Sequence, residues 1–276
     1  MLRSTEDIKG YVIAATDGDI GHVRDFYFDD RAWMVRYFVV DTGAWLLSRE
    51  VLISPMAMGQ PDWMQHKLPA LLTREQVKNS PAIDTARPVS RQHEVEYFTY
   101  YGYPDYWDGA GLWGGELYPG MGTPGPGGPG VPSAEQQEAR DAYVRAEQAH
   151  QREDDPHLRS CKEVVGYHLR ATDGAIGHVH SLLLDDQSWA IRYIVVNTSN
   201  WWLGHQVLIA PQWITDVSWS DSEVSVNLTR DAVQHAPPYD AAAQLDHEQE
   251  VGLYEYYGRP GYWGPQTGPE IKRMGE

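Results

Sequence analysis

The sequence has almost no cysteine and no long apolar run. Cys161 is the one cysteine in 276 residues, so the chain cannot form an internal disulfide and nothing indicates an oxidising compartment. No stretch approaches the roughly 18 to 20 consecutive apolar residues that a transmembrane helix needs. The polar N-terminus is also unlike a signal peptide. We therefore expect a soluble, cytoplasmic protein without a transmembrane segment.

Positive charge is scarce as well. The 22 Lys and Arg residues stand against 39 Asp and Glu, which gives a formal net charge of −17. This surplus repels the phosphates of nucleic acids and of anionic membranes, so we expect no nucleic-acid partner, whereas a basic protein would be attracted. Hydrophobic residues make up 42% of the chain, and 11 Trp and 17 Tyr supply enough apolar area to build cores.

The chain contains two related copies of one sequence. Residues 2–107 (copy 1) align without a gap with residues 158–263 (copy 2) at an offset of 156, and 43 of the 106 paired positions are identical. A repeat of this length indicates two complete folding units of ordinary domain size. We predict one domain over residues 1–107 and a second over residues 158–264.

The segment between the copies has a different composition. Residues 109–132 hold ten Gly and five Pro, which predicts a flexible linker. Ser133 and Gln136 have the spacing of a capping box and predict a polar helix over residues 134–152. We assign residues 108–157 to this linker and helix, and we expect residues 265–276 to form a disordered tail.

Each copy begins with short strands and tight turns. Asp17-Gly18, between two runs rich in β-branched and aromatic residues, predicts a β-hairpin, and Asp173-Gly174 repeats it. Trp33–Asp41 is apolar on both faces and predicts a central strand, followed by a strand at Val51–Ile53. Five or six short strands in about 70 residues favour a small closed barrel, which leaves no exposed edge.

Each copy ends in a helical and aromatic extension. Thr73 and Gln76 predict a capping box for a short helix, and Arg91–Tyr101 predicts a second helix that ends at Gly102. In copy 2, alternating apolar residues around Asp221-Ser222 predict a further hairpin. The predicted fold is mainly β, with two small closed barrels that are joined by the Gly/Pro-rich linker and the polar helix.

The order of these residues resembles a known family. The chain is similar to PRC-barrel domains in copy 1, and copy 2 matches at the offset positions. The residues of copy 1 that carry the resemblance are Gly10, Asp17-Gly18, Ile20-Gly21-His22-Val23, Phe28-Asp29, Trp33, Arg36-Tyr37, Val39-Val40-Asp41 and Val51-Leu52-Ile53-Ser54-Pro55. This barrel also occurs in the cytoplasmic domain of the photosynthetic reaction-centre H subunit and in a ribosome maturation factor. In that family it is an assembly surface, so the resemblance implies an interaction role, with an H-subunit-like accessory role as one alternative.

Two histidines are the candidates for ligand binding or pH sensing. His22 and His178 each follow an Asp-Gly turn, and histidine titrates near physiological pH and binds metals. Neither copy offers the three or four convergent ligands of a metal site, so the competing interpretation is a strand residue that bonds across the barrel. We predict no bound metal and no cofactor.

The other polar motifs predict structural roles. Asp29-Asp30 and Asp185-Asp186 stand between strands and predict turns. Arg36 and Arg192 lie in largely apolar strands and predict ion pairs, because a buried guanidinium needs a partner. Cys161 has no neighbouring histidine to activate it, and the chain lacks a nucleophile elbow and a phosphate-binding loop. We therefore predict no enzymatic activity, with a hydrolase of unrecognised site as a distant alternative.

Aromatic residues at corresponding places form the main candidate surface for a partner. The candidates are Trp45, Tyr100, Tyr101, Tyr106, Trp107, Trp201, Trp202, Tyr256, Tyr257, Tyr262 and Trp263. Clustered rings are usually buried, so closure of the barrels or packing of the copies on each other is the alternative to an exposed patch.

Our leading hypothesis is a non-enzymatic module for protein interaction, with two barrels in a pseudo-two-fold arrangement that also permits self-association. We expect the partner to be a protein, and the net charge of the chain favours a basic one. A small-ligand or cation-binding protein for stress or pH sensing, which would use His22 and His178, is the alternative.

Overall fold

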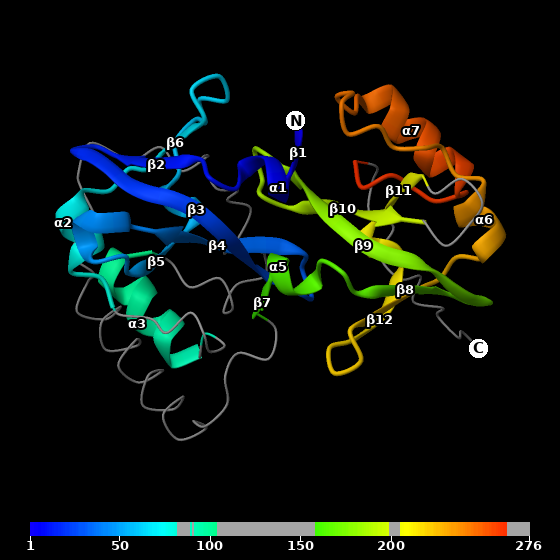
Figure 1. Ribbon diagram of the computed structural model, residues 1–276, viewed down its shortest axis with the longest axis horizontal. Helices are drawn as coiled ribbons and strands as arrows, with labels where there is room; N and C mark the ends of the chain where they lie inside the picture. Colours follow the sequence, from blue (N-terminus) through cyan, green and yellow to red (C-terminus); the bar gives the residue numbers. More distant parts are fainter. Residues whose placement is uncertain (82–88, 90, 104–157, 199–204, 264–276) are drawn as a thin grey trace, which may run out of the picture.

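The computed structural model describes residues 1–81, 89, 91–103, 158–198 and 205–263 (Figure 1). The predicted linker, polar helix and C-terminal tail lie outside the described residues. The described part is mainly β and holds two sheets. One sheet contains β2 (Val12–Ala15), β3 (Gly18–Asp29), β4 (Met34–Asp41), β5 (Glu50–Ile53), β6 (Lys67–Pro69) and β7 (Leu158–Ser160). The other contains β1 (Leu2–Ser4), β8 (His168–Ala171), β9 (Gly174–Asp185), β10 (Ile191–Asn197), β11 (Gln206–Ile209), β12 (Ile214–Ser218) and β13 (Glu223–Val226).

The predicted hairpins are present in both copies. β2 pairs antiparallel with β3, and β8 with β9. Gly18 and Gly174 adopt φ values of +140° and +139°, a backbone conformation that glycine reaches without a steric penalty. The predicted hairpin around Asp221-Ser222 is also confirmed, because β12 and β13 pair antiparallel on either side of it.

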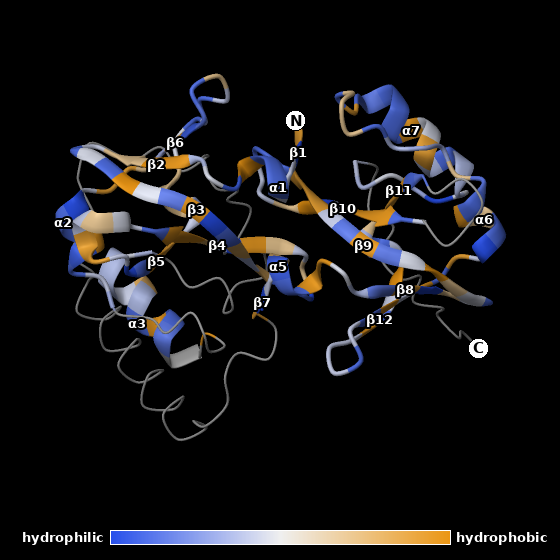
Figure 2. Cartoon of the chain, viewed as in Figure 1, coloured by the Kyte–Doolittle hydropathy of each residue, from blue (hydrophilic) through white to orange (hydrophobic). Residues whose placement is uncertain are grey.

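The predicted central strand is confirmed and begins one residue late. β4 lies between β3 and β5, and its residues Met34 to Val40 are all buried, as are most residues of β10. In Figure 2 apolar residues run along these two strands. Trp33 precedes β4 with a left-handed backbone (φ +51°) and donates its N–H to Asp29 O at 2.7 Å, so it closes the Asp-Asp turn instead of starting the strand.

The order of paired strands in each sheet has two end strands that do not pair with each other among the described residues. This order is β5-β4-β3-β2-β6 in one sheet and β11-β10-β9-β8-β13-β12 in the other, and β6 and β13 pair parallel with β2 and β8. Among the described residues no pairing joins the two ends of either path. The closed barrels therefore stay a prediction, while two mainly β units are observed.

Short helices and 3-10 turns connect and flank the strands (Figure 1). They are α1 (Thr5–Ile8), α2 (Arg74–Lys78), α3 (Arg91–Tyr101), α5 (Cys161–Val164), α6 (Arg230–Gln234) and α7 (His247–Tyr256), with the 3-10 turns η1 (Gly43–Leu46), η2 (Pro55–Ala57) and η3 (Pro211–Trp213). The capping box of Thr73 and Gln76 is confirmed. The predicted helix over Arg91–Tyr101 is confirmed as well, with Gly102 at φ +69° after its end.

The two copies exchange their first strands. β1 of copy 1 pairs with β9 of copy 2, and β7 of copy 2 pairs with β3 of copy 1, so each short strand lies in the other copy's sheet (Figure 1). Met34 and Ala190, which occupy equivalent positions in the two copies, form a bridge to each other. A contact between equivalent positions is what a local two-fold axis produces. The sequence analysis did not foresee the exchange, because three residues are too few to carry a pairing signal.

Candidate functional site

The junction between the copies is built from corresponding turns. Asp29 Oδ1 accepts the backbone N–H groups of Arg31 and Ala32 at 2.9 and 3.0 Å, which confirms the predicted turn. Its other oxygen accepts a hydrogen bond from Arg36 at 3.2 Å. Arg192 pairs with Asp185 at 3.4 Å in the same way. The predicted ion pairs of the two strand arginines are therefore confirmed, and each one fastens a turn to the strand that follows it.

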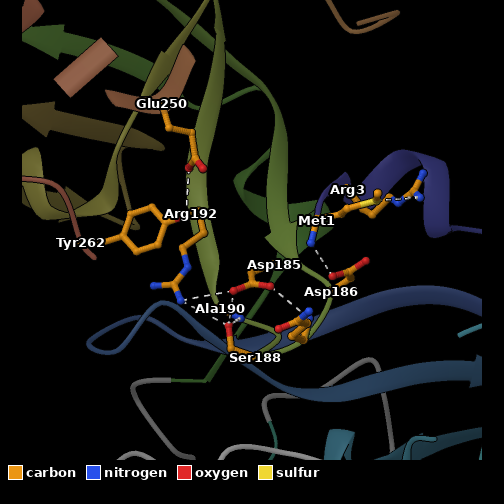
Figure 3. A network of polar contacts seen from close by, with 10 residues as sticks. Met1, Arg3, Asp185, Asp186, Ser188, Ala190, Arg192, Glu250 and Tyr262 are labelled. Atoms are coloured by element: carbon orange, nitrogen blue, oxygen red, sulfur yellow. Dashed lines mark hydrogen bonds and ion pairs between the residues drawn. The ribbon is translucent and has the colours of Figure 1, made fainter. Parts of the chain in front are cut away.

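The pKa of the Asp185 carboxyl group shows that its turn favours the charged form that pairs with Arg192. Burial by itself acts to raise the pKa of the Asp185 carboxyl group, but hydrogen bonds from Gln187 and Ser188 and the charge of Arg192 outweigh burial and lower that pKa. The carboxylate is held in its charged form by donors that converge on it. Figure 3 shows Arg192 and Ser188 directed toward it.

The second aspartate of each turn contacts the other copy. Asp30 accepts a hydrogen bond from Arg159 Nε of β7 at 3.2 Å. Asp186 accepts one from the Met1 amino group at 2.6 Å (Figure 3). Backbone hydrogen bonds join the same turns, from Val35 N to Trp189 O at 3.0 Å and from Ile191 N to Trp33 O at 2.7 Å. The Asp-Asp motifs are thus inter-copy connectors as well as turns.

A groove of about 470 Å³ lies at this junction and is lined by both copies. Copy 1 contributes the turn at 30–33 and copy 2 contributes 190–192 and the segment from Pro211 to Trp219. Thr215 and Asp216 on β12 are exposed, as is Arg31, which also lines the groove. β12 ends its sheet path and pairs with β13, and Arg159 stacks on the Trp219 ring at 4.3 Å. The groove therefore combines apolar rings, charges of both signs and an edge strand.

Side-chain size distinguishes this groove from the corresponding place on copy 1. Ala190 and Gln212 line it, and their equivalents in copy 1 are Met34 and Met56. Met34 is buried against Ala190, with Met56 packed beside the pair. The two sides of the junction therefore differ in side-chain size and polarity at these two positions.

The aromatic candidates divide into three groups. Tyr101 is buried in the core, and Trp45, Tyr257 and Tyr262 are partly buried. The exposed candidates are Tyr100 and Tyr256, each 41% exposed, and Trp263, which is 39% exposed. Tyr106, Trp107, Trp201 and Trp202 lie outside the described residues. Tyr101 thus fits core packing, whereas Tyr100, Tyr256 and Trp263 keep part of their rings at the surface.

The aromatic side chains of α3, α7 and η1 contact residues of their own copy. Tyr97 lies 5.2 Å from Tyr37 in an edge-to-face arrangement, and its hydroxyl accepts the Ser54 N–H at 2.9 Å. Tyr254 contacts Trp213 at 5.2 Å. Trp45 donates its indole N–H to Ile20 O and lies under Arg74. A ring contact that does cross between the copies joins Phe38 to Trp189 at 4.8 Å, outside the tails.

Two buried glutamates were missed by the sequence analysis. Glu94 is fully buried and Glu250 is 7% exposed; they accept hydrogen bonds from Tyr37 at 2.9 Å and from Tyr193 at 2.8 Å. Glu250 also accepts one from Tyr262 at 2.9 Å, whose ring lies beneath Arg192 (Figure 3). The available signal was a glutamate at the same position of both copies, within the apolar stripe of a helix.

The two candidate histidines lie at the surface of their strands. His22 is exposed and His178 is partly exposed. His22 stands opposite Asp41, and His178 stands opposite Asn197, so the copies do not offer the same chemistry there. No group of three or more His, Cys, Asp or Glu residues suited to a metal ion occurs in the described part of the chain.

The lone thiol is enclosed. Cys161 is buried at the start of α5, and burial, together with the nearby charges of Asp25 and Glu6, raises its pKa far above the ordinary value. The thiolate is the reactive form of cysteine, so this environment suppresses its reactivity.

Comparison with known proteins gives a family match in the first half of copy 1. The model of the PRC-barrel domain family matches residues 4–57. No curated protein matches the chain significantly. Within the described residues, no helix is both long and apolar enough to span a membrane.

Proposed function

Residues 4–57 belong to the PRC-barrel domain family, and from this premise we propose that the chain is a non-enzymatic module for protein interaction. Its two copies act as one unit and present the groove between them to a protein partner. The observation that carries the proposal is the reciprocal strand exchange, because it fixes the two copies together and gives both of them a part in one groove. No single copy supplies that surface.

The groove favours an extended segment of a basic protein. β12 is an end strand, and an end strand can accept one more strand through its backbone groups. Ile214 and Trp219, which are partly buried and line the groove, offer apolar contacts to side chains of such a segment. Asp216 at the rim and the net charge of −17 attract positive charge. The partner would therefore be bound both through backbone hydrogen bonds to β12 and through attraction between its positive charges and the negative charge of this chain.

Each sheet, in this proposal, curls into a barrel of the family type, and the barrel of copy 2 stays open beside β12, so that this end strand can accept a partner's strand. β3 and β9 support this idea because each is 12 residues long and has register shifts along its pairing. Bulges of this kind bend a strand and allow a sheet to curl. Each of the two strands also pairs along one edge with two different strands in succession.

A site-specific cross-linking experiment tests the proposed function. A photo-reactive amino acid is placed at Thr215, in the groove, and in a control chain at Glu75 on α2, away from it, and both chains are irradiated in cells that express them. We expect a protein adduct from position 215 that weakens severalfold with Asp216→Lys, and none from position 75. Equal adducts from both positions, or none from 215 in a folded chain, would overturn the proposal.

The ligand-binding alternative has a separate test. Purified chain is screened by thermal shift against divalent metals and common metabolites. A saturable shift that His22→Ala or His178→Ala abolishes would favour a small-ligand function over the interaction module.

A further inference from the structure

The two copies differ at one edge of their sheets. In copy 2 this edge is β12, which ends the strand order and pairs with β13 alone among the described residues. The equivalent segment of copy 1, residues 58–62, has no assigned strand and holds isolated bridges instead. Pro61 stands in this segment where copy 2 has Val217. Because proline has no backbone N–H, the two edges differ in what they can donate to another strand.

Backbone hydrogen bonds show where the N–H and C=O groups of Val217 point. Ser222 O, just before β13, accepts the His168 N–H of β8 at 2.8 Å. The Glu223 N–H belongs to the same planar peptide as that carbonyl and points the opposite way, toward β12. The next residue, Val224, then directs its backbone groups back toward β8, because neighbouring residues of a strand face opposite sides. Val217 lies opposite Val224, so its own N–H and C=O face away from β13, toward the free edge.

Copy 1 shows the same alternation at the equivalent positions. Asp62 N donates to Lys67 O at 2.8 Å and Lys67 N donates to Asp62 O at 3.0 Å, and these residues correspond to Ser218 and Glu223. Pro61 precedes Asp62, so it occupies the position whose N–H would face outward. A proline at an edge prevents the addition of another strand there. The sequence therefore closes this edge in copy 1 and leaves it open in copy 2.

Val217 also lies where the groove meets this edge. It is partly buried and lines the groove together with Ile214 and Trp219. The pairing of β12 with β13 shifts register between Ile214 and Asp216, and a shift of this kind interrupts a regular ladder. The backbone of Val217 is therefore the regular part of the edge that an added strand would meet beside the groove.

We propose that β12 accepts one extended segment of the basic partner through the N–H and C=O of Val217, and that the equivalent edge of copy 1 accepts none because of Pro61. This inference rests on the proposed function and names its pairing point. The segment adds as a further strand, with side chains against Ile214 and Trp219. A second copy of this chain is a poorer occupant, because two chains that each carry a net charge of −17 repel one another.

Titration calorimetry of the full chain with a short peptide in which lysine and valine alternate tests the pairing point. We expect the parent chain to bind one peptide per chain. Val217→Pro removes the outward N–H and should weaken binding about tenfold. The hairpin should tolerate this change, because copy 1 holds proline at the equivalent position, and a melting curve checks the fold. Val217→Ala keeps the N–H and should weaken binding much less than Val217→Pro does.

Three results would overturn the proposal. They are no saturable binding to the parent chain, two peptides bound per chain, and an equal loss of affinity in Val217→Pro and Val217→Ala. A parent chain that dimerises with rising concentration in size-exclusion chromatography, and stays monomeric as Val217→Pro, would assign the edge to a second copy and also overturn it. A photo-adduct from Thr215 that persists in Val217→Pro would retain the proposed function of the groove and reject pairing at Val217.

Discussion

Glu94 and Glu250 are single residues whose roles depend on the rings around them. Each glutamate lies in a core and accepts a hydrogen bond from a fully buried tyrosine, Tyr37 or Tyr193. Burial, and then the charge of Glu250, raise the pKa of Tyr193 far above its ordinary value, so the tyrosine stays protonated as a donor. A buried carboxylate is tolerated only with such donors. The two glutamates therefore orient aromatic side chains inside the core.

We predict that Glu250→Ala lowers the free energy of unfolding by about 2 to 4 kcal/mol, because it leaves a cavity and removes the acceptor of a buried hydroxyl. Glu250→Gln keeps an acceptor oxygen of the same shape and should cost about 1 kcal/mol. Urea unfolding followed by tryptophan fluorescence measures both. Equal losses in the two variants would show that the hydrogen bonds contribute nothing beyond packing.

The pH dependence of stability tests the environment of Asp25. Burial raises the pKa of the Asp25 carboxyl group in the folded protein above the value of about 3.9 expected when unfolded. The folded state then holds this proton more tightly, so ionisation costs stability as pH rises from about 4 through the folded pKa. Asp25→Asn, which does not ionise, should gain stability relative to the parent over that range in urea titrations between pH 3.5 and 7.

Asp41→Asn is the control of opposite sign. A hydrogen bond from the Gly43 N–H is the largest influence on the pKa of Asp41, and with Arg24 it lowers that pKa. The charged carboxylate is therefore favoured by folding, and its contribution is lost as pH falls through the folded pKa. The Asn variant should lose stability relative to the parent as pH rises. Parallel pH profiles for the two variants would contradict both assignments.

At the scale of elements, helix caps stabilise each copy, and one of the caps also contacts the other copy. The first short helix of each copy begins at an equivalent serine whose hydroxyl accepts a backbone N–H, Ser4 in copy 1 and Ser160 in copy 2. Ser160 also donates to Asp25 of the other copy, so the same side chain caps a helix and joins two sheets. Equivalent sequence thus gives equivalent local structure but different tertiary contacts.

Replacing these two serines separates the local role from the tertiary one. Ser4→Ala should cost about 1 kcal/mol, the usual loss of an N-cap. Ser160→Ala should cost about 2 to 3 kcal/mol, because it also removes a donor from a partly buried carboxylate. Chemical unfolding of both variants provides the comparison. If Ser160→Ala lowers the free energy of unfolding no more than Ser4→Ala does, the contact with Asp25 contributes nothing to stability.

One glycine in each long strand, Gly21 in β3 and Gly177 in β9, lies so close to the backbone of the neighbouring strand that no side chain fits there. A Cβ atom on Gly21 would lie 2.0 Å from Asp41 O, and one on Gly177 would lie 2.1 Å from Asn197 O. We predict that Gly21→Ala costs more than about 3 kcal/mol. Gly252→Ala is the matched control, because that helical position is open and alanine should stabilise α7 by up to about 1 kcal/mol. Melting curves distinguish the two.

The whole molecule is one unit because its copies are joined by strands as well as by the chain. Exchange of β1 and β7, the pairs of Asp30 with Arg159 and of Phe38 with Trp189, and the bridge at Met34 connect the copies without residues 104–157. A covalent connection raises the local concentration of the two halves but makes none of these contacts.

We therefore predict that a chain cleaved within residues 109–132 keeps both fragments together in size-exclusion chromatography at micromolar concentration. Arg159→Asp, which turns the ion pair with Asp30 into a repulsion, should promote separation after cleavage. Arg170→Asp is the control, since Arg170 pairs with Glu223 on the surface of its own copy. Separation of the parental fragments would contradict a strand-exchanged junction.

The local structure and the repeat can be predicted from the amino-acid sequence alone. Asp-Gly turns, the capping box at Thr73 and the apolar strand that becomes β4 follow from short-range sterics and hydrogen bonding, so they could be predicted residue by residue. The strand arginines and the Asp-Asp turns were also predictable, since a buried guanidinium requires a carboxylate. Pairing between the copies was not, because Leu2–Ser4 and Leu158–Ser160 have no intrinsic preference for one sheet. Long-range packing determines which strand edge each one completes, which rings are buried, and where the two copies together form a groove.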